Sequence, residues 1–470
     1  MKKKSALGLA MTVGLEVVMT PWAGVAPLVE AMRKTEVTSK ADKVLPLKRS
    51  SKGLTSGQML ECFVLLTTLG GECLEDMERL RRDKALAQML GYAIPAPETA
   101  RQWLDRFHDE EAMKGRPLQG SFLPPESGPL AGLKEVNRHV VRAYVQNVKV
   151  SQRVTLDIDA HLVETDKAGA RPCYEGFKSF QPIEVCWAET GLVLADEFRE
   201  GNVPVLMDNR RLVDEAYQAL PVGAWEIWVR SDAAGYGQDN LDHWDSQGWK
   251  FAVSASMSPQ LRAVMEDKRG VIREWAEVDH VPTKKSEKRE AKPYRYVGVR
   301  LRRQQGELFG DGASVRYFAV VSNIWDMDGR VLLDWHRGKA GTIEHVHHII
   351  KSELGGRSIP QWETWGQCRL AQAAGHNSQP AADAQGRRVA KGVCQCRSQA
   401  SEVCRIHRPG PDRTSCQAGK IEDTGETLGN TDPGSSRKSP GAQPTGFAED
   451  RPQHLEGGGG PWIVFVQKEA

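Results

Sequence analysis

Apolar and polar residues alternate along residues 153–159, which is the period-two pattern of a β-strand. Val154, Leu156 and Ile158 alternate with Thr155, Asp157 and Asp159. Carboxylates inside a strand core are costly unless something compensates them, and a divalent metal ion is one such compensation. The segment therefore predicts a buried strand that ends in acid, and it raises the question of which other acids meet Asp159.

The pattern of alternating strands and helices continues to about residue 256. We expect a hairpin from Pro182–Trp187 and Gly191–Ala195, a helix from Asn202 to about Leu220, a strand over Trp225–Asp232, a helix over Gln238–Ser246 and a strand over Trp249–Ser254. Three strands, a helix, a strand, a helix and a strand are typical of an α/β, RNase-H-like mixed sheet flanked by helices.

The N-terminal third reads as all-α. One helix is expected from Thr55 to Gly70, a second with a basic face over Cys73–Leu90, and a third from Glu98. Ala100, Trp103, Leu104 and Phe107 would share one face of that third helix. The pair of helices around Pro95 and Pro97 resembles a helix-turn-helix unit, in which Arg101, Gln102 and Arg106 would face DNA. An ordinary helical hairpin with a charged outer face fits equally well.

Four further segments complete the predicted organisation. Residues 113–130 are rich in Gly, Pro and Ser and predict a linker, followed by a helix over Leu133–Gln146. Residues 257–330 predict a β-rich insertion with strands near Arg295–Arg303 and Val315–Ser322, and a helix is expected from about Gly341 to Leu354. The expected domains are a helical DNA-binding region at 1–147, a catalytic core at 148–256 and 331–355, the insertion at 257–330, and a tail at 356–470.

Composition changes abruptly at that tail. Residues 1–355 contain 34 Leu, whereas residues 356–470 contain 3, together with five of the nine Cys. The tail is therefore expected to be low-complexity or disordered, and we infer that it is read out of frame. A zinc tail using Cys394, Cys396, Cys404, His407 and Cys416 is the alternative, although its Cys-x-Cys spacing suits structural zinc poorly.

Charge and composition exclude few functions. The net charge of the 470 residues is only +2, so any nucleic-acid surface must be local, such as the basic segment Lys284–Lys292 with Tyr294, Tyr296 and Trp325. The N-terminus imitates a secretion signal, but Glu16 interrupts its apolar run and no clean cleavage site follows. No uninterrupted apolar run reaches the length of a membrane span, and the Cys spacing suits reduced thiols. A cytoplasmic, nucleoid-associated protein is expected.

Three acids share the same kind of position. Asp159 and Asp232 end strands, and Glu344 lies near the start of a late helix. Neighbouring strand ends place two carboxylates together, and a helix packed beside them can supply the third. Hard carboxylate oxygens suit Mg²⁺ or Mn²⁺, and two such ions can activate an attacking oxygen and stabilise a leaving oxygen of a phosphodiester. Solvated or salt-bridged acids remain the alternative.

Four motifs then carry a resemblance to a known family. They are Leu156–Thr165, Tyr174–Pro182, Arg230–Tyr236 and His336–Glu344 with Lys351. In this order they resemble bacterial insertion-sequence transposases of the DDE class, the group with a β-strand insertion between the second Asp and the Glu. The resemblance covers about residues 55–355.

The resemblance implies a catalytic core that nicks transposon ends and joins the freed 3′-OH to target DNA. It makes Asp159, Asp232 and Glu344 the metal ligands, with Mg²⁺ or Mn²⁺ as cofactor, and it favours Asp159 over its rival Asp157. Double-stranded DNA, as terminal inverted repeats and target, would be the partner, with self-association on DNA and no membrane.

The sequence departs from the family pattern at two places. His161 stands where Thr or Ser is expected, and Ala340 stands where Arg is expected, so that Arg337 and Lys339 either substitute for that Arg or are surface charges. Lys351, two helical turns after Glu344, would hold a phosphate. His345, His347 and His348 are expected to be exposed helix residues, with a His metal ligand among them as the alternative. The alternative functions are a DNA-binding remnant that does not cut, and a general nuclease without end specificity.

Overall fold

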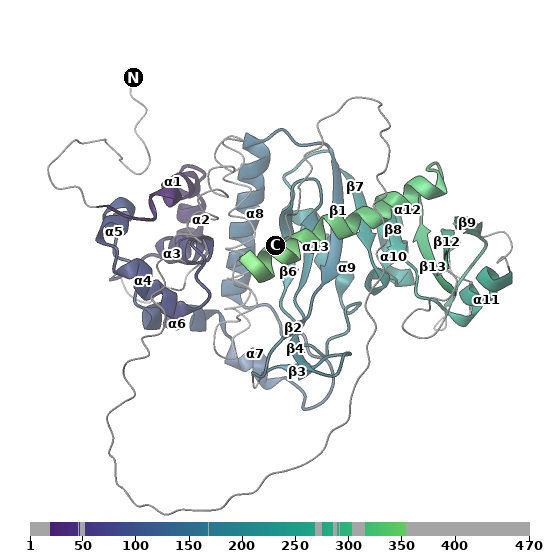
Figure 1. Ribbon diagram of the computed structural model, residues 1–470, viewed down its shortest axis with the longest axis horizontal. Helices are drawn as coiled ribbons and strands as arrows, with labels where there is room; N and C mark the ends of the chain where they lie inside the picture. Colours follow the sequence, from purple (N-terminus) through teal and green to yellow (C-terminus); the bar gives the residue numbers. More distant parts are fainter. Residues whose placement is uncertain are drawn as a thin grey trace, which may run out of the picture. The chain divides into compact units, whose positions relative to one another are not determined.

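The fold is built on an eight-stranded mixed β-sheet of order β6-β5-β1-β7-β8-β13-β12-β9 (Figure 1). The computed structural model describes residues 19–45, 47, 52–167, 169–267, 275–284, 289, 290, 292–302 and 315–353. The strands of this sheet are β1 (Arg153–Ala160), β5 (Ile183–Trp187), β6 (Leu192–Glu197), β7 (Glu226–Ser231), β8 (Lys250–Ser254), β9 (Trp275–Val278), β12 (Arg295–Arg302) and β13 (Val315–Ser322).

The first half of the sheet contains the predicted succession of three strands, a helix, a strand, a helix and a strand, and it is a mixed sheet as expected. Strand β1 pairs antiparallel with β5 and parallel with β7, and β7 pairs parallel with β8. Helices α9 (Asn209–Ala219) and α10 (Gln238–Ser246) connect these parallel strands. The prediction that the first of these helices begins at Asn202 is wrong. Asp208 has a left-handed φ of 59°, which a continuing α-helix does not tolerate, so α9 begins only after it.

The β-rich segment after residue 257 is confirmed, and it extends the same sheet. Strand β13 pairs antiparallel with β8, β12 pairs with β13, and β9 forms the edge. Helix α11 (Pro259–Asp267) precedes β9. Two small sheets lie outside the main one: β2 (Val163–Glu164), β3 (Arg171–Pro172) and β4 (Lys178–Phe180) form one, and β10 (Thr283–Lys284) pairs with β11 (Arg289–Glu290).

The N-terminal region is helical, as the sequence predicts. Its helices are α1 (Ala26–Lys34), α2 (Val37–Val44), α3 (Ser56–Thr68), α4 (Met77–Arg81), α5 (Lys84–Leu90), α6 (Pro97–Leu104), α7 (Glu110–Lys114) and α8 (Gly128–Asn147). A capping box between Thr55 and Gln58 sets the start of α3. The single helix expected over Cys73–Leu90 is instead divided into a short 3₁₀ turn, α4 and α5, because the side chain of Asp83 caps a new helix start.

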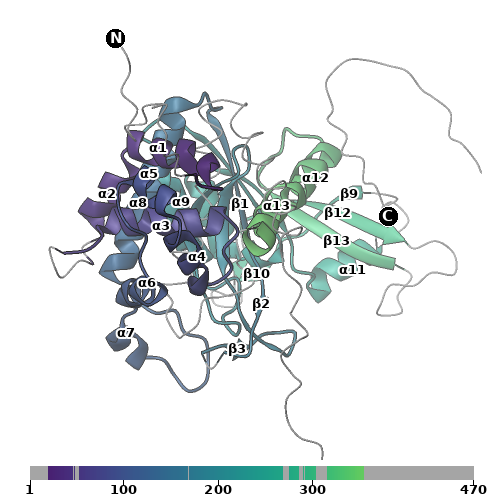
Figure 2. The ribbon, with the colours of Figure 1, turned by 60° about the vertical axis from the view of Figure 1, so that its left-hand side comes forward.

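The two faces of the main sheet differ in chemistry. Side chains at alternate positions of β1, such as Leu156 and Ile158, join a large apolar core with Leu212 and Val213 of α9. The intervening positions carry Asp157 and Asp159, and they face the other side because successive side chains of a strand alternate. On that side the sheet is covered by the helices after residue 328 (Figure 2).

Those covering helices are α12 (Gly329–Arg337), a 3₁₀ turn at Gly338–Gly341, α13 (Ile343–His348) and a π-helical turn at Ile349–Glu353. The predicted helix Gly341–Leu354 therefore exists in part, but the sequence prediction missed α12. Buried Ile343, Val346 and Ile350 pack on Cys186 and Val193 of the sheet. Within the described residues no helix has the length and apolar character needed to cross a membrane. The N-terminal start and residues 354–470, including the predicted frameshifted tail, lie outside the described residues.

Candidate functional site

Asp159 and Asp232 lie at the carboxyl ends of two adjacent parallel strands. The last aligned pair of β1 and β7 is Ile158 opposite Ser231; Asp159 is the next residue of β1, and Asp232 immediately follows the end of β7. Because both strands run in the same direction, both carboxylates emerge at the same edge of the sheet. The sequence-predicted meeting of these two acids is therefore what the strand register produces.

A lysine shares this edge with the two acids. The Nζ atom of Lys339, in the turn before α13, lies 3.1 Å from Oδ2 of Asp159. Burial raises the pKa of the Asp232 carboxyl above its ordinary value and the negative charge of Asp159 raises it further, whereas the charge of Lys339 and a backbone N–H from Ala234 lower it. The site thus places two mutually repelling carboxylates and one ammonium group together.

Asp157, the rival for the first acid, has a different environment. It is completely buried, and the guanidinium of Arg230 binds it with both nitrogens, Nε at 2.7 Å and Nη2 at 2.8 Å from the two carboxylate oxygens. The hydroxyl of Thr342 also donates to it. Such a bidentate, fully paired carboxylate has little capacity left for a metal ion. The geometry therefore favours Asp159 over Asp157.

Glu344 follows two residues after Thr342, at the start of α13, but its side chain is exposed. No hydrogen bond or ion pair joins it to another of the described residues. Its backbone position beside β1 is set by Lys339 and Thr342, which both reach that strand. Lys351 is partly buried in the π-helical turn beyond α13.

Comparison with known proteins identifies the family. A family model described as "Transposase DDE domain group 1" matches residues 17–350, well over half of the chain. The chain belongs to this DDE transposase family. A solved structure, a cryo-EM piggyBac transposase synaptic complex with hairpin DNA, is similar to it at 11% identity and a TM-score of 0.46, covering 82% of each chain. No curated protein matches the sequence.

The acids of this DDE-family chain suit a hard divalent cation. Two carboxylates at one edge supply only oxygen ligands, which Mg²⁺ and Mn²⁺ prefer. The ammonium of Lys339 beside Asp159 shows that the edge accommodates positive charge. Glu344 completes the set only if its exposed carboxylate turns toward this edge.

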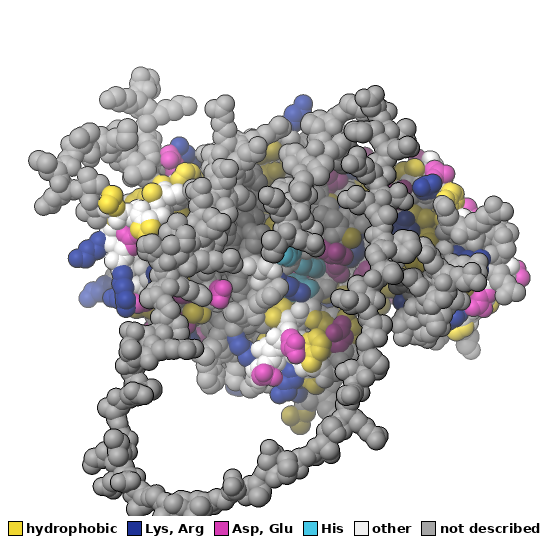
Figure 3. Space-filling model, in the orientation of Figure 1, with side chains coloured by type: hydrophobic (Ala, Val, Ile, Leu, Met, Phe, Trp, Pro, Cys, Tyr) yellow, Lys and Arg dark blue, Asp and Glu magenta, His cyan; other side chains and the backbone are white. Residues whose placement is uncertain are grey.

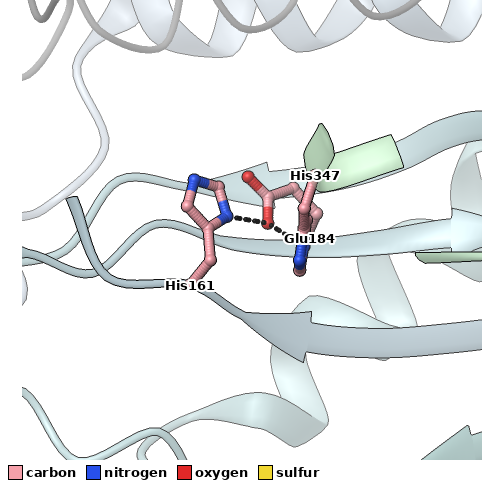
Figure 4. A group of neighbouring side chains, drawn as sticks. All are labelled: His161, Glu184 and His347. Carbon is pink, nitrogen blue, oxygen red and sulfur yellow. Dashed lines mark hydrogen bonds and ion pairs between the residues drawn. The ribbon is translucent and has the colours of Figure 1, made fainter. Parts of the chain in front are cut away.

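A second group of ionisable residues was not anticipated. His161 at the end of β1, Glu184 of β5 and His347 of α13 are all buried, and both imidazole rings are directed at one carboxylate (Figure 4). The prediction that His347 is exposed is wrong, because Ile343, Val346, His347 and Ile350 recur at helical spacing and form the inward face of the helix. That pattern could have revealed His347. Glu184 could also have been found from the sequence, because it is an acid within the apolar run Ile183–Trp187.

The predicted DNA-contacting residues have mixed positions. Arg106 is exposed and donates to the carbonyl of Leu47, and Arg337 is exposed beside Asp334. The guanidinium of Arg101 binds Glu75 at 2.8 Å. Lys339 is buried, so it is not a surface charge.

The predicted surface around Lys284–Lys292 is only partly supported. Tyr294 and Tyr296 are buried, with their side chains packed in the core of the sheet, so the expectation that they contact DNA is wrong. Trp325 is 66% exposed. Lys292 pairs with Asp245, and most of the basic segment lies outside the described residues.

Proposed function

We propose that this DDE-family chain is a DNA transposase that binds the ends of its element, hydrolyses phosphodiester bonds there and joins the freed 3′-OH to target DNA. The observation that carries the proposal is the position of Asp159 and Asp232 at one edge of the sheet, beside Lys339. The family match supports the same reaction class. The β6-β5-β1-β7-β8 part of the sheet would be the RNase-H-like core.

Asp159 and Asp232 would hold Mg²⁺ or Mn²⁺, with Glu344 as the third carboxylate. Ions bound there would polarise the phosphodiester and help to activate the attacking oxygen. The residues around them have supporting tasks. Arg230 and Thr342 bind Asp157 and thereby fix the segment that leads to Glu344 against β1.

Lys339 holds a positive charge beside Asp159, which limits the repulsion between the two aspartates. Because Lys339 is almost completely buried, its ammonium group interacts with these carboxylates rather than with the DNA backbone. The exposed Arg337, Arg106 and the partly buried Lys351 and Arg101 are the proposed phosphate contacts. Phosphate contacts of this kind position duplex DNA without reading its sequence.

Chain segments 1–147 and 257–330 would bind DNA, and 148–256 with 331–355 would cut it. Duplex DNA carrying the element's terminal inverted repeats, and target DNA, are the proposed partners, with self-association on DNA. On the face seen in Figure 3, acidic, basic and histidine side chains of the described residues lie close together near the centre. Such a mixed surface is compatible with a DNA site built around metal-binding acids.

The test is an end-cleavage assay with Mg²⁺ on duplexes that carry the repeats flanking the gene. Asp232→Ala should lower the cleavage rate by at least about a hundredfold, because metal-ion catalysis contributes several kcal/mol and each 1.36 kcal/mol is tenfold. Asp326→Ala, which removes an exposed acid next to Trp325, is the matched control and should cleave like wild type. Equal cleavage by wild type and Asp232→Ala would reject the assignment.

The same assay separates two other functions. A DNA-binding remnant would retain end binding but show no metal-dependent nicking by the wild type, as expected if the altered tail fails to close the core. A general nuclease would cut duplexes with and without the repeats at similar rates. End-specific cutting that requires Asp232 supports the transposase.

A further inference from the structure

The buried group formed by His161, Glu184 and His347 has the composition of a transition-metal site. The Nε2 atom of His347 lies 3.0 Å and the Nδ1 atom of His161 lies 3.4 Å from the same oxygen, Oε2 of Glu184. The three potential ligand atoms all lie within 4.8 Å of one another, and this is the only such group of three among the described residues. A zinc ion about 2.1 Å from each of its tetrahedral ligands spaces them about 3.4 Å apart.

The polar atoms of this group are not all satisfied by hydrogen bonds. Nδ1 of His161 is buried and lies 3.4 Å from Oε2 of Glu184 without forming a hydrogen bond of good geometry. A buried imidazole nitrogen with so poor a hydrogen bond costs free energy. The two rings have centroids 4.5 Å apart and an interplanar angle of 52°, so they converge on the carboxylate rather than stack on each other. A cation between the three ligand atoms would engage this nitrogen.

Electrostatics favours an additional positive charge at this position. In the pairing of β1 with β5, Glu184 is directly opposite Asp159, and like charges directly opposite each other destabilise a sheet. Lys339 compensates Asp159. Glu184 is completely buried and has two imidazoles against it.

We propose that His161, Glu184 and His347 bind one borderline divalent transition-metal ion, with Zn²⁺ as the representative, at a site that adjoins the proposed Asp159–Asp232 edge but uses none of its carboxylates. Two imidazole nitrogens and one carboxylate oxygen suit such an ion, whereas Mg²⁺ prefers oxygen ligands. Three protein ligands leave a fourth position for water or an anion.

The ion would join three elements that are distant in the sequence. His161 follows β1, Glu184 lies in β5, and His347 is one turn after Glu344 on α13. Binding would therefore fix the helix that carries the proposed third acid against the sheet. The site also depends on His161, the position at which the resemblance in the sequence leads one to expect Thr or Ser. Metal binding itself does not require that the proposed transposase function is correct.

The experiment uses the full chain, purified without a polyhistidine tag, stripped with a chelator and incubated with ZnCl₂. After gel filtration, elemental analysis should find one Zn²⁺ per chain more in wild type than in His161→Thr or His347→Gln. His161→Thr introduces a residue of the related pattern, and His347→Gln replaces the imidazole with a neutral amide of similar size, so both should fold. Retention of the far-ultraviolet circular dichroism of wild type checks this.

Two controls locate the ion. His345→Gln and His348→Gln change exposed residues of the same helix and should retain the full Zn²⁺ content. Asp232→Ala should also retain it, because its carboxylate is not one of the three proposed ligands.

Cobalt distinguishes this site from the cysteines of the tail. Substitution with Co²⁺ should give visible d–d absorption without the near-ultraviolet thiolate charge-transfer band that cysteine ligands produce, and His161→Thr should remove the d–d bands. The proposal is overturned if stripped wild type takes up no stoichiometric Zn²⁺, if its cobalt spectrum shows thiolate ligation alone, or if folded His161→Thr and His347→Gln retain as much metal as wild type.

Discussion

Two aspartates on the same face of β1, Asp157 and Asp159, have different partners, and we call their surroundings the first and the second corner. Asp157 is paired on both oxygens with Arg230 and also accepts from Thr342, and it is fully buried. Asp159, two residues further along β1, faces Lys339 on one oxygen and lies near the charge of Asp232. Both side chains point to the α12–α13 side of the sheet, because residues two apart in a strand share a face.

The difference lies in how much of each carboxylate's capacity is used. A carboxylate accepts several hydrogen bonds, and the Asp157 corner supplies them from three groups of the protein. The Asp159 carboxylate receives fewer hydrogen bonds from the protein, and a second carboxylate lies near it where Asp157 has a guanidinium. The first corner therefore anchors α12 and α13 to the sheet, and the second retains electrostatic attraction for a cation.

The largest loss of stability is expected when the ion pair of the first corner is removed. Arg230→Ala leaves the buried Asp157 charge without its partner, which typically costs about 3–5 kcal/mol. It also removes the donor to the carbonyl of Trp335 in α12. Urea denaturation should show this loss as a lower midpoint.

Arg337→Ala is the matched control for that change. Its ion pair with Asp334 is 3.6 Å long and both side chains are more than half exposed. Exposed pairs contribute little, so the midpoint should barely move. If Arg230→Ala were as mild as Arg337→Ala, the two corners would not differ as we describe.

The next largest effect on stability is expected from the protonation of His336. The ring of His336 donates to the carbonyl of Ser231, which lies between Arg230 and Asp232. Burial, together with the nearby positive charges of Lys339, Arg230 and Arg337, lowers the pKa of His336 from 6.5 to about 4. The unfolded chain therefore binds more protons than the folded chain between these two values.

Stability related to His336 is fully present above pH 6.5 and is lost as the pH falls toward 4, by up to about 3 kcal/mol. His336→Gln should flatten that part of the pH–stability curve, measured by urea titrations between pH 7 and 4. His345→Gln, which removes an exposed ring, should leave the curve as in wild type. An unchanged slope in His336→Gln would contradict the prediction.

The smallest change in stability is expected at the second corner, when the positive charge beside Asp159 is removed. Lys339→Met removes the ammonium beside Asp159 and should cost about 1 kcal/mol, because Asp159 is partly exposed and water can replace part of the interaction. Mg²⁺ should then stabilise Lys339→Met more than wild type, since a bound ligand stabilises the folded state by mass action. Thermal unfolding with and without MgCl₂ measures both. Equal Mg²⁺ shifts in the two proteins would show that Lys339 and the ion do not share the corner.

Several features followed from local patterns. The alternation in residues 153–159 predicted β1, and the acids at the ends of two strands predicted that Asp159 and Asp232 meet, because parallel neighbours end at one edge. The apolar spacing of Ala100, Trp103, Leu104 and Phe107 predicted the buried face of α6 and of the 3₁₀ turn that follows it, and all four are buried. Such patterns depend only on the geometry of a single element.

Other features depended on contacts between distant segments. Nothing in the turn Gly338–Gly341 indicates that Lys339 points inward, and its burial follows from the way α12 lies on the sheet. The pairing of Asp157 with Arg230 requires the register of β1 against β7. The Glu344 assignment and the DNA contacts remain predictions.

The sequence by itself indicated most strands of the core and the position of two acids at strand ends, because hydrophobic period and strand ends are local properties, and its motifs indicated the family. The tertiary structure decided which acid of β1 is free of a guanidinium partner, and it brought His161, Glu184 and His347 together from three elements. That decision required packing, since the partner of a buried charge is chosen by which distant side chains the folded chain brings within reach.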